Sequence, residues 1–460
     1  MKTIFMPIFH GHIARNVLLT DIFKILAGQA DLKLVIFTYD FKKDYYQKEF
    51  GGPNVIIEAV SDEKIERAKH ENFFKPLFAA FAHSSRTILV FKERRDEGGN
   101  YWQYLGRRFL AATVGRSRRL REIIRWFYYR LVPPKKILEE YFEKYKPDAV
   151  FLADMTFHID NYLQRVARER GIPSIAMLRS WDALTSSKGT IRVKPDKLIV
   201  HNEFMEKMAI KFGDMKTEDI FIGGMPHFDH YFINQPTAKS EFFGRIGLDL
   251  DKKVVLFALT GPRTAGINQD IIMMISQAIT NGRLSQNTQL LVRMHPNSQR
   301  EEFKDSPHTV FHRPAGIYFN QGRLSDMEFN QEWLQELMDS LFYSDVTINA
   351  QSTMSIDASA FDKPIINLAF DGYEKLPYIR SVRRLYDIAH YQPILKSGGV
   401  RLVYSETELL DWLNRYLVDP TLDRAGRQRI LTEQGGSVDG GNGRRTADCI
   451  LEFLKVNIDS

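Results

Sequence analysis

The stretch that decides the fold is residues 345–364, DVTINAQSTMSIDASAFDKP. Its β-branched run at 346–348 is typical of a buried strand. A small polar turn at 349–353 follows, and residues 354–361 are apolar at helical spacing. A proline stops that helix, and a second apolar strand follows at 365–368. The order strand, turn, helix, strand predicts a parallel α/β unit.

The polar turn in this stretch is a candidate anion site. Turns after parallel strands lie at the carboxyl edge of the sheet, where ligands bind, and the next helix directs its N–H groups there. We predict that Gln351, Ser352 and Thr353 bind a nucleotide phosphate. Asp357 lies one helical turn further in, within reach of sugar hydroxyls. The alternative is that Ser352 or Thr353 only caps the helix.

The N-terminal sequence shows the same alternation. A strand is predicted at residues 3–9 and a helix at 13–26, before a second strand, and this order opens a doubly wound fold. His10, Gly11 and His12 form the turn after the first strand, where the glycine lets the backbone approach a ligand closely. Either histidine is a candidate acid, base or phosphate donor, and the alternative is a structural role.

Two polar loops follow later strands of the same half. Asp154 and His158 lie in the first loop, and Trp181 and Asp182 lie in the second. A carboxylate beside an indole suits a general base, because partial desolvation raises its pKa toward the working pH. We therefore rank Asp182 first as catalytic base, with His12 and Asp154 behind it. The alternative for Asp182 is a helix cap or an Asx turn.

A strand in the second half ends in Arg293-Met-His295-Pro296. Arg293 and His295 have the same parity, so both point to one face if the strand extends that far. The loop after an earlier strand adds Gly261 and Arg263. Arginine and histidine donors stabilise a diphosphate leaving group where no metal does so. No Asp-x-Asp pair suited to a catalytic metal stands out, so we expect no metal site.

Length and composition suit two ordinary domains. The chain has 460 residues, of which 44% are hydrophobic, and we place the boundary near residue 236. This gives an N-terminal domain at 1–235 and a C-terminal domain at 236–460 that ends in a helix. A single cysteine excludes a disulfide framework. With no secretion signal and no apolar run of about 20 residues, we expect a cytoplasmic protein.

A basic segment lies at residues 107–136. It holds ten Lys or Arg residues against one acidic residue, Glu122, and apolar residues recur between them at helical spacing. This pattern predicts one basic amphipathic helix that lies on an anionic membrane surface. The equally weighted alternative is a solvated helix that packs its apolar face on its own domain. Binding to nucleic acid is the least favoured of the three.

These motifs resemble those of GT-B glycosyltransferases. The nearest pattern is the bacterial surface-polysaccharide group that includes CDP-glycerol glycerophosphotransferases and the sialyl- and Kdo-type transferases. Their C-terminal domains carry a His-Pro motif, here His295-Pro296, and a Ser-Ser or Ser-Thr motif, here Ser352-Thr353. Asp357 takes the place of the acid in the helix that ends in Gly-Lys-Pro, with Asp362 replacing the glycine. Asp182 stands where the glycerophosphotransferases have the histidine of Trp-His-Gly.

The resemblance implies two Rossmann-like domains facing across a cleft. The C-terminal domain would bind the donor nucleotide, and the N-terminal domain would bind the acceptor with His10, Gly11, His158 and Trp181. The implied enzyme is a metal-independent glycosyltransferase with no cofactor. Its co-substrate would be a CMP-, CDP- or UDP-linked sugar, and its acceptor a surface polysaccharide such as capsule or O-antigen, or a lipid-linked glycan. It would lie on the inner face of the cell membrane.

Three other functions remain open. A UDP-sugar 2-epimerase-type isomerase shares the fold and a similar donor helix, and would act on the nucleotide sugar without an acceptor. A CDP-glycerol glycerophosphotransferase would use a different donor. A non-catalytic scaffold would keep the fold only for nucleotide or lipid binding.

Overall fold

The computed structural model describes residues 1–61, 71–132, 136–155, 157–185, 191–260, 265–295, 298–319 and 327–458. The chain forms two compact units. Unit 1 comprises Met1–Asp229, Tyr318–Glu328 and Asp439–Ser460, and unit 2 comprises His230–Ile317 and Phe329–Val438. The chain first passes from unit 1 to unit 2 at Asp229, close to the boundary expected near residue 236.

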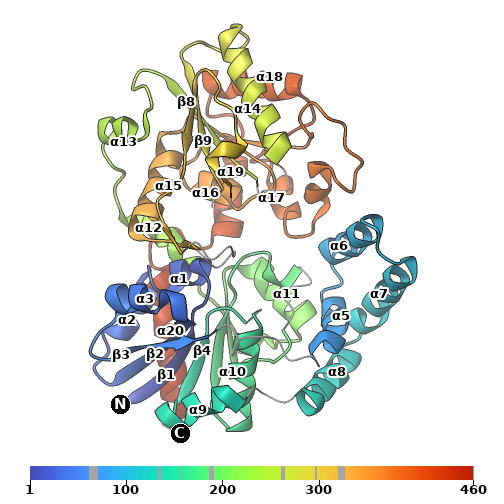
Figure 1. The fold of residues 1–460 in the computed structure, drawn as a ribbon, viewed down its shortest axis with the longest axis vertical. Helices are drawn as coiled ribbons and strands as arrows, with labels where there is room; N and C mark the ends of the chain where they lie inside the picture. Colours follow the sequence, from blue (N-terminus) through green and yellow to red (C-terminus); the bar gives the residue numbers. More distant parts are fainter. Residues whose placement is uncertain are drawn as a thin grey trace. The chain divides into compact units, whose positions relative to one another are not determined.

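Unit 1 is built on a seven-stranded parallel sheet with the order β3-β2-β1-β4-β5-β6-β7 (Figure 1). Its strands are β1 Lys2–Pro7, β2 Leu32–Tyr39, β3 Val55–Val60, β4 Ala149–Leu152, β5 Ser174–Met177, β6 Lys197–Val200 and β7 Ile220–Ile222. The order reverses between β1 and β4. Ligands of doubly wound sheets bind at such a point, beyond the carboxyl ends of the strands.

The helix expected at 13–26 is two helices, α1 Gly11–Val17 and α2 Asp21–Ala27. Thr20 separates them with an extended backbone, φ −124° and ψ 174°. Its hydroxyl donates to the carbonyls of Asn16 at 3.1 Å and Val17 at 3.0 Å, and so satisfies groups that a continuing helix would have paired. The expectation of one helix was wrong because apolar spacing continues across a break made by a side-chain hydrogen bond.

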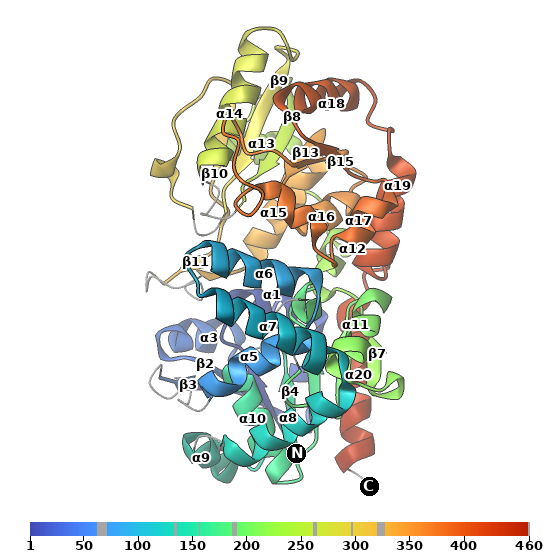
Figure 2. The ribbon, with the colours of Figure 1, turned by 90° about the vertical axis from the view of Figure 1, so that its right-hand side faces the viewer.

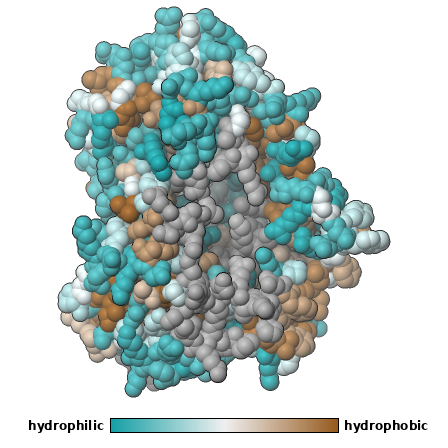
Figure 3. Space-filling view, in the orientation of Figure 1, coloured by the Kyte–Doolittle hydropathy of each residue, from teal (hydrophilic) through white to brown (hydrophobic). Residues whose placement is uncertain are grey.

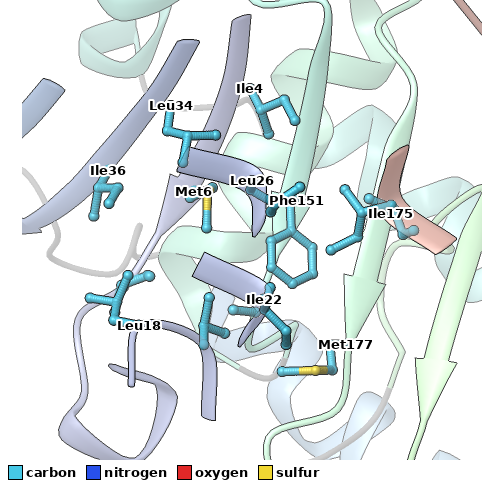
Figure 4. Packing of buried hydrophobic residues seen from close by; sticks show 14 of the residues in the cluster. Ile4, Met6, Leu18, Ile22, Leu26, Leu34, Ile36, Phe151, Ile175 and Met177 are labelled. Carbon is cyan, nitrogen blue, oxygen red and sulfur yellow. The ribbon is translucent and has the colours of Figure 1, made fainter. Parts of the chain in front are cut away.

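The core of unit 1 is formed by alternate strand residues that point to one face of the sheet (Figure 4). Ile4 and Met6 of β1 lie beside Leu34 and Ile36 of β2, and Phe151, Ile175 and Met177 continue the layer from β4 and β5. Ile22 and Leu26 of α2 cover it. All of these side chains are buried, as the period-two pattern of a strand requires.

The C-terminal helix α20, Asn442–Ile458, belongs to unit 1. Its Ile450, Phe453 and Leu454 join the core described above, and α20 packs against α2 (Figure 1). Asp229 holds its first turn, because the backbone N–H of Gly443 donates to Asp229 at 2.6 Å. The expectation that this helix completes the second domain was therefore wrong. Its apolar stripe shows that it packs, but the sequence does not show on which core.

Unit 2 has a six-stranded parallel sheet with the order β10-β9-β8-β13-β14-β15. Its strands are β8 Lys253–Ala258, β9 Thr288–Arg293, β10 Thr309–His312, β13 Val346–Asn349, β14 Ile365–Leu368 and β15 Arg401–Val403. The helices include α14 Ala265–Thr280, α15 Gln331–Tyr343, α16 Met354–Ala360 and α18 Glu406–Val418. The expected fold class, α/β with two Rossmann-like doubly wound domains, is confirmed.

A group of helices, α5 Glu71–Phe81, α6 Ser85–Asp96, α7 Tyr101–Thr113 and α8 Arg118–Leu131, lies beside the sheet of unit 1 (Figure 2). The single basic helix expected at 107–136 was wrong, because a short 3-10 turn and Ser117 divide it. The Ser117 side chain accepts from the N–H of Leu120 at 3.3 Å and starts α8. Within the described ranges, no helix is both long and apolar enough to cross a membrane.

Candidate active site

The carboxyl edge of the unit 1 sheet gathers most of the predicted catalytic and acceptor residues. His10 follows β1, Asp154 follows β4, and Arg179 and Asp182 follow β5. These strands are parallel, so their ends meet on one side of the sheet. The topology thus places residues that are far apart in sequence at one edge.

Asp154 is fully buried and forms an ion pair with Arg179, with 3.0 Å between the carboxylate oxygen and the guanidinium nitrogen. Asp160, near the start of α10 His158–Glu169, is also buried beside it. Burial, together with the charge of Asp154, raises the pKa of Asp160 well above its usual value, which favours the protonated form of this carboxyl group. Sequence reasoning missed Asp160, because only the fold brings it to Asp154.

His10 is half-buried next to this ion pair, and its ring meets Phe157 edge-on with 4.7 Å between centroids. Burial lowers the pKa of His10 to about 4; Asp154 opposes the shift, and Arg179 and Lys42 add to it. Lys42 is fully buried and donates to the carbonyl of Phe9 at 3.1 Å. At pH 7 the imidazole is therefore neutral, the form in which a ring nitrogen can accept a hydrogen bond or a proton from a hydroxyl group.

Asp182, the first-ranked base, is half-buried and accepts a hydrogen bond from the hydroxyl of Ser180 at 2.6 Å. Its backbone carbonyl accepts from the N–H of Thr185 at 3.2 Å, so Asp182 precedes and begins the 3-10 turn Ala183–Thr185. Trp181 beside it is buried. The neighbouring residues 186–190 lie outside the described part of the chain.

The remaining predicted residues of unit 1 lie at helix starts. Gly11 begins α1 and is buried, whereas His12 is exposed. His158 begins α10, is buried, and packs against Phe157 with 4.3 Å between ring centroids. His12 and His158 therefore differ in access to a ligand, and only His12 is open to solvent.

In unit 2, a buried polar network lies directly beneath the turn at 349–353. The Ser355 hydroxyl donates to the Asn349 side chain at 3.2 Å and lies 2.8 Å from the Tyr391 hydroxyl. The Tyr391 hydroxyl also donates to the side chain of Asn367 at 2.6 Å, and Asn367 donates to Asn349 at 3.0 Å. All four residues are fully buried, so the network fixes the position of the turn.

A second set of contacts holds the exposed side of the same turn. The Gln351 side chain lies 2.8 Å from a ring nitrogen of the buried His390, and its backbone N–H donates to the Tyr386 hydroxyl at 3.3 Å. Tyr386 in turn donates to the carbonyl of Leu368 at 2.7 Å. Sequence reasoning missed residues 386–391. Their only local signal is a run of Tyr, His and Tyr outside any regular apolar pattern.

The Ser352 hydroxyl accepts a hydrogen bond from the backbone N–H of Met354 at 3.2 Å, where α16 begins. Ser352 therefore caps the start of this helix, which was its alternative role. Thr353 is exposed and makes no side-chain cap hydrogen bond. Asp357 is buried, and it accepts a hydrogen bond from the Tyr231 hydroxyl at 2.9 Å. This carboxylate therefore already has a protein partner, whereas the predicted role was to bind sugar hydroxyls.

The end of β9 differs from the prediction. The strand stops at Arg293, so the condition under which Arg293 and His295 would share one face is not met. Arg293 is buried against α15, with its guanidinium 5.3 Å from the ring centroid of Trp333 and 3.4 Å from the Ser340 hydroxyl. His295 is half-buried, and burial lowers its pKa. Gly261, Arg263 and Pro296 lie outside the described residues.

Asp362 explains a departure from the motif. It has φ +51°, a left-handed conformation that glycine adopts freely and Asp tolerates better than most residues. Its carboxylate pairs with Arg424 at 2.6 Å and with the buried Arg427 at 2.9 Å. The position thus keeps the backbone of the Gly-Lys-Pro helix end. A search of the described residues finds no group of three or more His, Cys, Asp or Glu side chains placed to hold a metal ion.

Solved structures with a similar fold include two that contain UDP or a UDP-sugar. Staphylococcus aureus MnaA with UDP is 12% identical, with a TM-score of 0.54, and the match covers 99% of this chain and 98% of that one. The Neisseria meningitidis UDP-GlcNAc 2-epimerase bound to UDP-GlcNAc is 11% identical, with a TM-score of 0.53 and coverage of 98% and 100%. At this identity the likeness concerns the fold.

A glycosyltransferase from Rickettsia africae is also similar, at 10% identity, a TM-score of 0.50 and coverage of 99% and 98%. No curated protein sequence matches the chain. A family model for CDP-glycerol:poly(glycerophosphate) glycerophosphotransferases matches residues 179–452, more than half of the chain. That stretch includes Asp182, the strand that ends at Arg293 and the turn at 349–353. The resemblance to GT-B transferases is thereby confirmed, and the chain belongs to the CDP-glycerol:poly(glycerophosphate) glycerophosphotransferase family.

Proposed function

We propose that this chain transfers a group from a nucleotide-activated donor to a hydroxyl of a surface glycan or a lipid-linked acceptor. The polar turn at 349–353 carries the proposal. It lies at the carboxyl edge of the unit 2 sheet on a network of buried hydrogen bonds, which is how a preorganised phosphate site is built. Family membership supports a donor linked through a diphosphate, since the family is described by its use of CDP-glycerol.

Unit 2 would bind the donor nucleotide. Gln351, Ser352 and Thr353 offer amide and hydroxyl groups at the turn, and His295 follows a strand of the same sheet. Gly261, Arg263 and Pro296 complete the predicted donor set from the sequence. Arg293 would add positive charge from the end of β9, where its guanidinium is buried against Trp333. Asp357 would hold this site through Tyr231 more than through direct sugar contact.

Unit 1 would bind the acceptor and remove its proton. We propose His10 as the base, because its imidazole is neutral at pH 7 and half-exposed, with the Asp154–Arg179 ion pair beside it. Asp154 itself is fully buried and would position His10. Asp182 is the second candidate. Of the other predicted residues, the exposed His12 would contact the acceptor, and the buried Gly11, His158 and Trp181 would shape the site beneath it.

Two donor chemistries fit this arrangement, and the released nucleotide distinguishes them. If the acceptor oxygen attacks the anomeric carbon of an NDP-sugar, the sugar C–O bond breaks and a nucleoside diphosphate leaves. If it attacks the terminal phosphorus of CDP-glycerol, a P–O bond of the diphosphate breaks and CMP leaves. In both reactions the acceptor proton passes to the base.

Calorimetry with CMP, CDP, UDP and GDP tests the donor site. Gln351→Ala should weaken the preferred nucleotide about 5–10-fold, the effect of one hydrogen bond, while Gln428→Ala, an exposed glutamine on α19 Arg424–Ile430, should not. Equal binding by both variants would contradict the site. His10→Gln should lower the rate by roughly 10²–10⁴ with nucleotide affinity unchanged. A wild-type rate in that variant together with loss in Asp182→Asn would move the base to Asp182.

The epimerase alternative is favoured by the UDP-GlcNAc 2-epimerases among the structures of similar fold. Donor alone separates it from transfer, because an epimerase converts UDP-GlcNAc without an acceptor. Tight nucleotide binding with no product from either reaction would instead indicate a scaffold.

A further inference from the structure

The helices α7 and α8 present an apolar face to solvent. Trp102 and Phe109 on α7 are 76% and 67% exposed, and Ile123, Trp126, Phe127 and Leu131 on α8 are each about half exposed. Figure 3 shows apolar surface gathered at the lower right, where α8 lies. Large apolar side chains grouped in this way mark an interaction site, whereas single ones on a surface do not.

The opposite face of α8 is unusually polar for a buried face. Arg121, Arg125 and Tyr128 point inward, and each is at most 4% exposed. Asp214, at the end of α11 Glu203–Gly213, holds both arginines, with 2.8 Å to Nε of Arg121 and 2.7 Å to Nη1 of Arg125. This ion cluster fixes the rotation of α8. The helix therefore turns Arg121 and Arg125 to the protein, where Tyr128 and part of Ile124 pack with apolar residues of α5. Most of its large apolar side chains face solvent, whereas a helix that packs on its own domain usually buries them.

The rim of the apolar face is positively charged. Arg108, Arg116, Arg118, Arg119 and Arg130 are exposed along α7, α8 and the turn between them. The only acidic residue between positions 101 and 132 is Glu122. That carboxylate is paired with Arg125 at 3.0 Å and with Lys194, so it does not neutralise the rim.

We propose that the α7–α8 face docks on an anionic phospholipid surface. Exposed tryptophan and phenylalanine suit the boundary between headgroups and acyl chains, and the arginine rim complements anionic headgroups. A second copy of the chain would bring two positive rims together and is disfavoured by repulsion. Nucleic acid would match the charge and could stack on the aromatic rings, but it would leave the aliphatic Ile123 and Leu131 in water, whereas acyl chains cover both kinds of side chain.

Co-sedimentation of the full chain with vesicles tests the docking. Wild-type protein should pellet with phosphatidylcholine vesicles containing 30% phosphatidylglycerol, should not pellet with pure phosphatidylcholine, and should be released as salt shortens the Debye length. Each basic residue near the surface contributes about fivefold in affinity, so the charge-reversed double variant Arg118→Glu, Arg119→Glu should lose at least about 25-fold. The double variant Ile123→Ser, Trp126→Ser should also fail to pellet.

Matched controls use exposed residues away from the face. Lys207→Glu on α11 and Val418→Ser in unit 2 should pellet like wild type. The substituted side chains of the test and control variants are all exposed, so we expect every variant to fold. Circular dichroism spectra and melting temperatures equal to those of the wild type check this. Wild-type protein that stays in the supernatant with anionic vesicles at low salt would overturn the proposal. Three other results would also overturn it: undiminished pelleting of both double variants, self-association of the wild type that the Ile123→Ser, Trp126→Ser variant loses, and tighter binding to RNA than to vesicles.

Discussion

Replacing Asp214 with asparagine should loosen α8 from unit 1. Asp214 has φ +57°, and asparagine tolerates this left-handed conformation as well as aspartate does, so the change removes charge with little backbone effect. It leaves Arg121 and Arg125, both nearly fully buried, without their shared carboxylate. Removing one partner of a buried ion pair costs about 3–5 kcal/mol.

The structure points to the lower end of that range. Arg125 keeps hydrogen bonds to the carbonyls of Ile191 and Gly213, both at 3.1 Å, so its guanidinium is not stripped of acceptors. A loss of about 3 kcal/mol corresponds to roughly 100-fold faster local opening, because each 1.4 kcal/mol is a factor of ten. Burial opposes ionisation of Asp214, but hydrogen bonds from Arg121 and Arg125 hold its pKa below the usual value. The stabilisation is thus complete above about pH 4 and is lost as the pH falls through the lowered folded value.

Hydrogen exchange measured by mass spectrometry provides the assay. Peptides covering α8 and α11 should exchange about 100-fold faster in Asp214→Asn, while peptides from unit 2 should not change. Glu143→Gln, which removes a surface pair with Arg170, is the matched control and should leave exchange nearly unchanged, because solvent screens exposed pairs. Exchange of α8 within twofold of wild type would refute the claim that this cluster fixes the helix.

Three further predictions concern stability. Asp362→Gly removes the strain of a left-handed φ, about 1 kcal/mol, but it also removes the carboxylate that pairs with the buried Arg427. Because that carboxylate is partly exposed, the free energy of unfolding in urea should fall by about 1–3 kcal/mol. An increase would show that the backbone strain is the larger effect. Tyr391→Phe should cost about 1–3 kcal/mol in the same measurement, because Asn367 loses a buried donor, and an unchanged midpoint would contradict the network. Burial lowers the pKa of His201 to about 4, so the stability that the neutral ring contributes is complete above about pH 6.5 and falls toward pH 4. In His201→Gln the melting temperature should therefore decline less steeply over this pH range. An equally steep decline would contradict the assignment to His201.

The sequence alone determined the fold class and the place of the polar turn at 349–353. Period-two apolar runs and the strand, turn, helix order depend on neighbours a few residues apart, and these patterns survive in any context. The strand at β13, the turn at 349–353 and the helix after it all lie where predicted. Parallel strands place every such turn at one edge, so the positions of His10 and Asp154 directly after strands are enough to assign both residues to that edge of the sheet.

Tertiary structure decided which side each helix buries and which polar groups meet. Much of the apolar stripe of α8, including Ile123, Phe127 and Leu131, is exposed, and Asp214, 93 residues from Arg121, holds the arginines inward. Asp160 and His390 reach the candidate sites only through packing, and α20 joins the core of unit 1 from the far end of the chain. The period of the apolar residues predicts that a helix has an apolar face. Long-range contacts decide what that face packs against, because their free energies exceed the local preferences. Such contacts join residues far apart in the chain, so no local pattern in the sequence indicates them.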